Sequence, residues 1–289
     1  MGARVRKAVL PVAGLGTRVL PGAKTTPKNL LNVVDRPILS YVVEEARAAG
    51  IEHFVFIVGR GQGAIEDYFD SSPEIENTLE AKGKLDILAD IRRDLLQPGQ
   101  MSFIRQMAPL GLGHAVWCAR DVIGDEPFAV MLPDMLMMAK TSALAQCVDA
   151  YDQKGGNIIA VEPAPQGEAH KYGIVALDGQ DGRLNRMTGM VEKPAPGTEP
   201  SNLFISGRYI LQPDIFEILE TQERGAGGEI QLTDGMFNMM KTQEFHALEY
   251  EGVTYDCGDK IGLLRANVAF ALARPDLADE ARKAILELL

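Results

Sequence analysis

Residues 10–28 read LPVAGLGTRVLPGAKTTPK, an apolar run that leads into a loop with Gly14, Gly16, Thr17 and three cations. The run Lys7–Ala13 predicts a buried strand. Glycines directly after a strand let the backbone approach a phosphate closely, and successive N–H groups there can bind the anion. Residues 1–34 hold six Lys or Arg and no Asp or Glu, although the whole chain carries −11. This stretch therefore predicts a site for a small anion on an acidic protein.

Two well-known phosphate loops do not fit this segment. Gly14 and Gly16 match the first two positions of the dinucleotide fingerprint GxGxxG, but Val19 stands at the third and Pro21 follows at once. No GK[ST] follows either, so the loop is not a Walker A motif. The sequence thus argues against an NAD-dependent oxidoreductase and against a P-loop enzyme.

The first half of the chain alternates apolar strand-like runs with helical patterns. Such alternation predicts a parallel sheet with helices on both faces, an α/β fold of the Rossmann-like three-layer type. Residues 74–96 are charged and amphipathic, and we expect them to form a helical insertion on the outside. The other strands expected in this half are His53–Val58, Ser102–Arg105 and Phe128–Leu132, and the helices are 38–50 after Pro37, Ala64–Phe69 and Gly113–Val122.

The second half changes character, because its strands are separated by Gly, Pro and Asp rather than by helices. This predicts a mixed extension or flap, so that the central sheet as a whole is mixed but mainly parallel. No low-complexity linker or repeat divides the chain, and residues 1–289 are expected to form a single domain. The strands expected here are 158–161, 173–176, 187–192 and 203–210, and the helices are 214–220, 230–241, 261–273 and 276–289.

Composition narrows the class of partner and the compartment. An acidic chain repels nucleic acid and anionic membranes, so neither is expected as a partner. The three cysteines form no CxxC pair, which is typical of free thiols in a reducing compartment. No apolar run approaches 18 residues, and we expect a soluble cytoplasmic protein.

Two acidic residues stand at positions that suit a metal ion. Asp134 ends the strand-like run FAVMLPD, and Asp256 follows a strand in VTYDCGDK. Carboxylates at the carboxyl ends of strands lie in the crevice where α/β sheets bind ligands. Mg²⁺ usually takes one or two carboxylates together with substrate oxygens, so the pair predicts a Mg²⁺ site. Asp259 is the expected cap of the following helix.

The string G-x-G-T-R, followed about ten residues later by P-K, resembles the nucleotidyltransferases that make nucleotide sugars. PVAGLGTR, GLGHAV, EKP and GEIQLTD are similar, in order, to the strings of the bacterial UTP–glucose-1-phosphate uridylyltransferases. The resemblance implies the nucleotide-diphospho-sugar transferase fold, with Mg²⁺ as cofactor. It implies transfer of the uridylyl group of UTP to α-D-glucose 1-phosphate, giving UDP-glucose and pyrophosphate. It also implies a homodimer or homotetramer, formed through the C-terminal helices.

The resemblance assigns the residues of a nucleotide site. Arg18 and Lys28 would hold the phosphates as catalytic cations, and Gln106 would read the base. An amide such as Gln106 matches a donor and an acceptor on a pyrimidine edge. Gly111 would leave room for the ring. The loop residues that would approach the nucleotide are Ala13, Gly14, Gly16 and Thr17.

The sugar side is assigned in the same way. Glu192 would bind the sugar hydroxyls, catalytic Lys193 the sugar phosphate, and Gly173 in KYGIV would let the sugar approach the backbone. Pro194 favours an extended Lys193, which would send these two adjacent side chains to opposite faces. The competing interpretation is a surface ion pair. Residues 227–234, GGEIQLTD, are expected to have a structural role near the sugar or in a subunit contact.

One departure and two alternatives remain. After Pro27-Lys28 the family usually has Glu and, three residues on, Pro, whereas this chain has Asn29 and Asn32. Asn29 remains able to hydrogen-bond a base.

Two alternative functions remain open on the same fold. They are a dTTP-using glucose-1-phosphate thymidylyltransferase and a non-catalytic nucleotide-sugar sensor.

Overall fold

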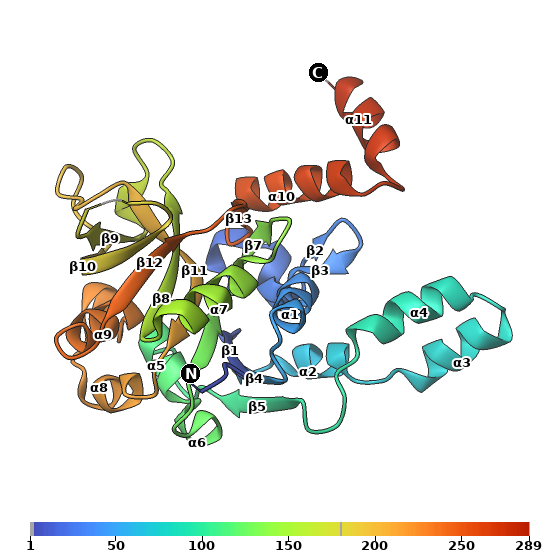
Figure 1. Ribbon diagram of the computed structural model, residues 1–289. Coiled ribbons are helices and arrows are strands. Elements are labelled where there is room, and N and C mark those ends of the chain that lie inside the picture. The colour runs from blue at the N-terminus through green and yellow to red at the C-terminus, as the bar shows by residue number, and fades with distance from the viewer. Residues whose placement is uncertain (1–2, 180, 289) are drawn as a thin grey trace.

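A nine-stranded sheet forms the centre of the computed structural model, which describes residues 3–179 and 181–288 (Figure 1). Within these residues, β10 and β11 pair antiparallel with their neighbours, and the other seven strands share one direction. The predicted mixed, mainly parallel sheet is therefore confirmed. In spatial order the strands are β5 (Met101–Arg105), β4 (His53–Val58), β1 (Lys7–Pro11), β6 (Phe128–Met131), β11 (Leu203–Leu211), β8 (Asn157–Pro163), β12 (Phe245–Glu249), β10 (Leu184–Glu192) and β9 (Gly173–Leu177).

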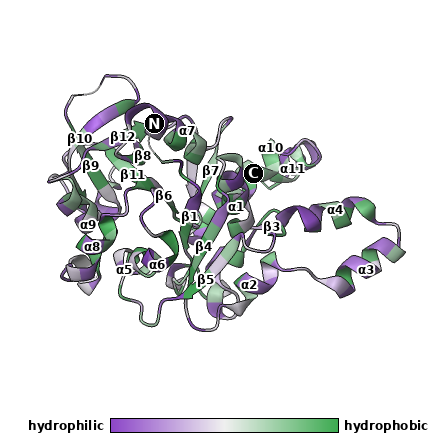
Figure 2. Cartoon of the chain, turned by 60° about the horizontal axis from the view of Figure 1, so that its bottom comes forward, coloured by the Kyte–Doolittle hydropathy of each residue, from purple (hydrophilic) through white to green (hydrophobic). Residues whose placement is uncertain are grey.

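Helices cover both faces of this sheet. Successive strand residues point to opposite faces, so Ala8 and Leu10 of β1 join one core and Val9 joins the other. Figure 2 shows hydrophobic colouring along central strands such as β4. The first core packs against α1 (Ile38–Ala48), α2 (Gly63–Phe69) and α7 (Ala143–Lys154). The second packs against α5 (Leu112–Trp117), α6 (Arg120–Ile123), α8 (Ile215–Thr221) and α9 (Leu232–Met239). The three-layer architecture is thus confirmed.

Several element boundaries can be compared with the sequence. Helix α1 begins directly after Pro37, and Gly50 follows its end with φ of +87°, as predicted. Strand β1 ends at Pro11, two residues before the expected end. The single helix expected over 113–122 is wrong, because α5 ends at Trp117 and α6 begins at Arg120. Short-range bonds such as Ala119 N to Val116 O (2.9 Å) tighten the chain at this junction.

The expected outer helical stretch is a hairpin of two helices. α3 (Pro73–Ala81) and α4 (Leu85–Asp94) are joined at Gly83, whose φ is +66°. The hairpin projects from the body of the molecule in Figure 1, and α4 alternates hydrophilic and hydrophobic colour in Figure 2. The predicted outside position is confirmed, and one helix is replaced by two.

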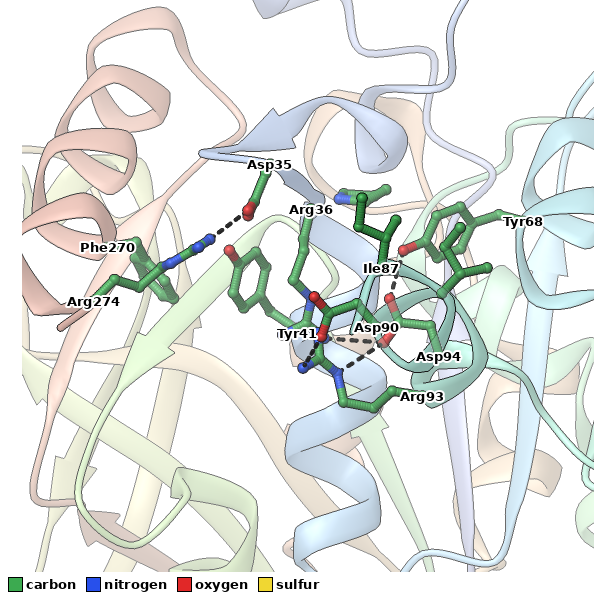
Figure 3. Close-up of a pocket in the computed structure, with 12 residues that line it drawn as sticks. Asp35, Arg36, Tyr41, Tyr68, Ile87, Asp90, Arg93, Asp94, Phe270 and Arg274 are labelled. Carbon is green, nitrogen blue, oxygen red and sulfur yellow. Dashed lines mark hydrogen bonds and ion pairs between the residues drawn. The ribbon is translucent and has the colours of Figure 1, made fainter. Parts of the chain in front are cut away.

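Asp94 anchors this hairpin to the body. Its carboxylate accepts hydrogen bonds from Ser40 Oγ (2.6 Å), Tyr68 Oη (2.6 Å) and Arg36 Nη2 (3.1 Å). Figure 3 shows Asp94, Tyr68 and Arg36 at a cavity of about 560 Å³ between α1, α4 and the end of α10 (Lys260–Ala273). Burial opposes the charge of Asp94, but the bonds from Ser40 and Tyr68 outweigh it and lower the pKa of the carboxyl.

Two small sheets and the C-terminal helices complete the fold. β7 (Met135–Met138) pairs with β13 (Val253–Asp256), and β2 (Asn32–Val33) pairs with β3 (Arg36–Pro37). Strand β12, which the sequence did not indicate, lies between β8 and β10. α10 and α11 (Ala278–Leu286) extend away from the sheet in Figure 1. None of the helices in the described residues has the length and apolar character needed to cross a membrane.

Candidate active site

The glycine loop after β1 folds over Lys28. Gly16 has φ of +64°, a conformation that costs little only without a side chain. A β-carbon there would lie 2.9 Å from Cβ of Lys28 and 3.1 Å from Cβ of Ala23. Thr17–Val19 then form a short 3-10 turn that carries Arg18. Glycine at position 16 is therefore needed both for the turn and for the approach of Lys28.

A cavity of about 360 Å³ opens beside this loop. All six residues that the sequence assigns to nucleotide binding line it, which brings together segments about 90 residues apart. The volume and the exposed glycine backbone suit a flat ring and a sugar. The predicted residues are Ala13, Gly14, Gly16, Thr17, Gln106 and Gly111, and the other lining residues include Leu15, Pro109 and Glu229.

Gln106 is held in one orientation at the wall of this cavity. Its Nε2 donates to the backbone oxygen of Gly111 (3.2 Å) and to Nδ1 of His114 (3.0 Å). Both amide hydrogens are thus used inside the protein, and the carbonyl oxygen is the atom with which Gln106 can bind a ligand. Burial, with the nearby Arg120 charge, lowers the pKa of His114 and favours the neutral ring that accepts this bond. The sequence did not single out His114, and its only signal is its position within GLGHAV.

A distant segment supports the strip 110–113. Ile230 N donates to Leu110 O (2.7 Å), and Gly113 N donates to Ile230 O (2.8 Å). A β-carbon on Gly111 or Gly113 would come within 2.8 Å of Ile230 O. This contact explains the glycines of GLG. The string GGEIQLTD, which was expected near the sugar or in a subunit contact, also supports the wall of the nucleotide cavity through Glu229 and Ile230.

Strand pairing brings the two predicted metal ligands together. Asp256 lies opposite Met135 in the antiparallel pair β13–β7, and Cys257 N donates to Asp134 O (2.8 Å). The residues are far apart in the chain, yet the short sheet sets both carboxylates at the carboxyl end of β6. The following Asp259 caps α10 through bonds from Ile261 N and Gly262 N, as predicted.

Two cations compensate these acids. Nζ of Lys28 lies 2.5 Å from Oδ2 of Asp134, and the guanidinium of Arg18 lies 3.9 Å from Asp134 and 3.5 Å from Asp256. Burial opposes charge on Asp134, but Lys28 outweighs it and lowers the pKa of this carboxyl. Burial and the neighbouring Asp134 charge raise the pKa of Asp256, against the opposing effect of Arg18. The two acids therefore have different proton affinities within one cluster.

Gly258 is a residue of this cluster that the sequence did not single out. A β-carbon there would lie 2.5 Å from Arg18 Nη2, 2.8 Å from Asp256 Oδ1 and 2.9 Å from Asp134 Oδ2. Its N–H donates to Oδ1 of Asp256 (2.8 Å). The signal was its place in DCGD, between the metal candidate and the helix cap.

The acids and this space fit a hard divalent cation with a nucleotide. In residues 3–179 and 181–288 no group of three or more His, Cys, Asp or Glu side chains could hold a metal ion by itself. Mg²⁺ does not need one, because it keeps several waters and takes one or two carboxylates plus phosphate oxygens. Asp134 and Asp256 provide that pair, and the missing side chain of Gly258 leaves room between them.

The predicted sugar residues also lie together. Glu192, at the end of β10, is opposite Gly173, and its Oε2 accepts a bond from Thr233 Oγ1 (2.7 Å). A β-carbon on Gly173 would lie 3.1 Å from Glu192 Oε2, so a side chain there would crowd the carboxylate. The buried Tyr209 lies near Glu192 and Asp134. Burial and these two charges raise the pKa of its hydroxyl.

Lys193 corrects the expected geometry. Its φ is +47° rather than extended, and its Nζ lies 3.4 Å from Oε1 of Glu192. The two side chains therefore lie on the same side, and the prediction of opposite faces is wrong. The backbone bond from Lys193 N to Tyr172 O (3.0 Å) holds this turn against the usual preference before proline. A left-handed residue that is not glycine is a strained feature typical of functional sites.

Asn29 also corrects an expectation. It is 0% exposed, and its Nδ2 donates to Val12 O (3.3 Å) beneath the loop. It cannot reach a base, so the idea that it hydrogen-bonds one is wrong. Asn32 is an exposed residue of β2 and does not line the cavity.

Comparison with known proteins shows the family of this chain. The family described as nucleotidyl transferase matches residues 7–271. The UTP–glucose-1-phosphate uridylyltransferase of Bacillus subtilis is 47% identical over 277 residues, which cover 96% of this chain and 94% of that protein.

Solved structures of similar proteins have names of the same kind. The UTP-bound UGPase from Acinetobacter baumannii is 42% identical, covers 99% of this chain and 100% of its own, and superposes with a TM-score of 0.91. A UDP-glucose pyrophosphorylase complexed with UDP-glucose is 38% identical, covers 93% of this chain and 100% of its own, and has a TM-score of 0.83.

Proposed function

The chain belongs to the nucleotidyl transferase family, and we propose that it transfers the uridylyl group of UTP to α-D-glucose 1-phosphate, releasing pyrophosphate and UDP-glucose. The observation that carries this function is the convergence, at one end of the sheet, of a nucleotide-sized cavity and a cluster of acids and cations. The relatives at 38–47% identity are uridylyltransferases or UDP-glucose pyrophosphorylases by name. They favour this reaction over thymidylyl transfer and over a sensor without catalysis.

The chemistry requires charge compensation rather than a general base. A phosphate oxygen of the sugar phosphate attacks the α-phosphorus in line, and pyrophosphate leaves on the opposite side. The nucleophile is already an anion near neutral pH. Two like charges 4 Å apart repel by about 4 kcal/mol at an effective dielectric constant of 20, so two polyanions need nearby cations. Positioning and electrostatics then supply the catalysis.

We assign that compensation to three side chains. Arg18 and Lys28 follow the glycine loop and would hold the nucleotide phosphates. Lys193, beside Glu192, would hold the sugar phosphate. An ammonium has three donors, so Lys28 can keep its bond to Asp134 and still donate to a phosphate.

A divalent metal ion belongs to this reaction, and we propose that it is Mg²⁺ held by Asp134 and Asp256. When bound, the ion neutralises phosphate charge and fixes the phosphates relative to the two carboxylates. The low pKa of Asp134 keeps one ligand ionised. A cation that binds both carboxylates opposes protonation of Asp256.

Substrate recognition uses the two walls described above. The carbonyl oxygen of Gln106 would accept the imide N–H of uracil, and the backbone of Gly111 lines the same cavity. Glu192, supported by Thr233, would accept sugar hydroxyls beside Gly173. Thymine presents the same imide edge, so the preference for UTP over dTTP must depend on space at the 5-position or on the ribose 2′-hydroxyl that dTTP lacks.

Assembly and location complete the proposal. We expect a single-domain protein that forms a homodimer or homotetramer through α10 and α11, in the cytoplasm. α10 exposes Ile261 and Leu264, and in the described residues Ala266 is its one buried position. Size-exclusion chromatography with light scattering tests the assembly, and a monomer at micromolar concentration would contradict it.

Pyrophosphate release is the test of the function. The purified protein is incubated with UTP, glucose 1-phosphate and MgCl₂, with parallel reactions that contain dTTP or EDTA. We expect rapid UTP-dependent release that EDTA abolishes. Faster release with dTTP would assign the chain to thymidylyl transfer. A folded sample that is silent with every nucleotide and sugar phosphate would indicate a sensor.

A further inference from the structure

Arg208 of β11 is a fully buried cation, at 0% exposure, and no sequence motif connects it with the site. Its Nε and Nη2 donate to the two carboxylate oxygens of Glu45 at 3.1 and 2.7 Å. Its Nη1 donates to the backbone oxygens of Leu132 (3.0 Å) and Gly207 (3.1 Å), and Nη2 donates to that of Met135 (2.8 Å). These bonds use all five N–H donors of a guanidinium.

Two of those acceptors flank the turn that carries Asp134. Leu132 and Met135 enclose Pro133 and Asp134, and one planar group binds the carbonyl on each side. The turn's own bond, from Met135 N to Leu132 O, is long at 3.3 Å. The bonds from the guanidinium to the two flanking carbonyls, at 3.0 and 2.8 Å, are thus shorter than the turn's internal hydrogen bond.

The backbone of β11 is shaped to bring Arg208 there. Gly207 has φ of +87°, and a β-carbon on it would lie 3.0 Å from Cβ of Leu132. Leu132 N donates to Gly207 O (2.9 Å), and the pairing of β11 with β8 shifts register between Ile205 and Tyr209. The irregularity places the turn directly against the strand that holds the arginine.

Glu45 fixes the other side of the guanidinium. It belongs to α1, and its Oε1 also accepts a bond from Leu144 N of α7 (3.0 Å). Helices on one face of the sheet are thereby connected, through two side chains, to the turn that bears Asp134.

We propose that Arg208, oriented by Glu45, is a positioning residue that sets the carboxylate of Asp134 for a divalent cation. The inference rests on the proposed function, because that function gives Asp134 its task. Replacing a buried ion pair by apolar side chains is often neutral or stabilising, so fold stability alone is a weak reason for the pair. A rigid fork that binds two carbonyls at fixed spacing is instead suited to holding a turn. Groups behind a metal ligand typically change metal affinity 10–100-fold when altered.

The test compares three variants of the full-length protein. Arg208→Lys keeps the charge but loses the planar fork, and Glu45→Gln places an amide donor against the guanidinium. Asn157→Ala is the matched control: Asn157 is equally buried, in β8, and bonds Gln243, Glu244 and Gln212 rather than the Asp134 turn. Far-UV circular dichroism and thermal melting establish folding for each.

Two readouts do not depend on turnover. Hydrogen–deuterium exchange of residues 132–136 is measured in metal-free protein, and Mn²⁺ binding in the presence of UTP is measured by the loss of the free Mn²⁺ EPR signal. We expect faster exchange at this turn and Mn²⁺ affinity weakened about 10–100-fold in Arg208→Lys, with a smaller change of the same sign in Glu45→Gln. kcat should fall, while KM for UTP changes little. Asn157→Ala should lower Tm and leave both readouts unchanged.

The outcomes separate this inference from the function. Wild-type exchange and Mn²⁺ affinity in a folded Arg208→Lys or Glu45→Gln would overturn the positioning role. Loss of folding in both variants, with Asn157→Ala folded, would assign the pair to stability and also overturn it. Absence of pyrophosphate release by the wild type would contradict the proposed function. Hydrogen–deuterium exchange of residues 132–136 would still show whether Arg208 holds the turn.

Discussion

The ammonium of Lys28 donates a 2.5 Å hydrogen bond to the carboxylate of Asp134, although 106 positions separate the two residues. The bond joins the glycine loop after β1 to the turn after β6. It also explains why Asp134 and Asp256, two acids of one cluster, have pKa values shifted in opposite directions.

Asp134→Asn should remove metal-dependent turnover. Asparagine keeps the shape of the side chain and removes the charge that binds a divalent ion. The ion stabilises the transition state by several kcal/mol, so its loss corresponds to a decrease of about 10³-fold or more in kcat. Pyrophosphate release as a function of MgCl₂ concentration measures it. Asp259→Asn is the control, because asparagine caps a helix as well as aspartate does and should keep the rate near that of the wild type. Unchanged metal dependence in Asp134→Asn would disprove the assignment.

Asp256→Asn should stabilise the metal-free protein at pH 7. The pKa of Asp256 is raised by burial and by Asp134, so folding favours its protonated form. That contribution is greatest below the unfolded carboxyl pKa of about 3.9 and is lost as pH rises through the folded value. Relief of such an active-site penalty is expected to raise Tm by roughly 1–4 °C in EDTA, measured by calorimetry. The variant should gain less Tm than the wild type from MgCl₂ with UTP, and a lower Tm in EDTA would contradict the idea.

Gly16→Ala should distort the glycine loop and slow the reaction. The alanine would have to keep the left-handed backbone of Gly16, and its Cβ would lie 2.9 Å from Cβ of Lys28. Displacement of a phosphate-binding residue by about 1 Å can cost about 100-fold in rate, and kcat/KM for UTP measures this. Gly22→Ala, where a β-carbon meets open space, is the matched control and should behave as the wild type. Equal activity of the two variants would refute the packing argument.

Lys193→Ala should slow the reaction about 10²–10³-fold, the usual loss when one charged or hydrogen-bonding group at a developing negative charge is removed. Its KM for glucose 1-phosphate should rise, while that for UTP stays nearly constant. Lys171→Ala is the control, because Lys171 is similarly exposed (51% against 55%) and also pairs with a glutamate. A near-wild-type rate for Lys193→Ala would remove this residue from the site.

UTP affinity should weaken in acid through His114. The pKa of His114 is lowered, so the neutral ring that accepts the Gln106 bond is stable at pH 7. The stabilisation is complete above the unfolded pKa of about 6.5 and is lost as pH falls through the folded value. KM for UTP is therefore expected to rise about 3–10-fold below that value, from the cost of one hydrogen bond. His114→Asn, whose side-chain oxygen accepts without titrating, should flatten the profile, and an unaltered profile would exclude His114 as the cause.

Much of the site could be predicted because its residues follow strands. Side chains directly after parallel strands meet at one edge of a sheet, so the glycine loop and Asp134 had to be neighbours once the α/β pattern was recognised. Local chemistry also predicted the Asp259 cap and the end of α1 before Gly50.

The remaining features depend on contacts between distant segments. Lys193 should be extended before a proline, but its backbone bond to Tyr172 O keeps it left-handed. Asn29 is polar, yet it is buried, and its side-chain amide donates a hydrogen bond to Val12 O. Strand β12 is defined by its pairing with β8 and β10, which lie far from it in the sequence. No local pattern contains this information.

The segment 230–233 touches both halves of the substrate site within four residues. Ile230 supports the base wall through Leu110 and Gly113, and Thr233 supports Glu192 on the sugar wall. For redesign this means that the base preference and the sugar preference cannot be changed independently of each other. Substitutions at 111–113 and at 192 should show non-additive effects in double-mutant cycles, because they share one short support. A library that changes the accepted sugar will therefore need to vary the base wall as well.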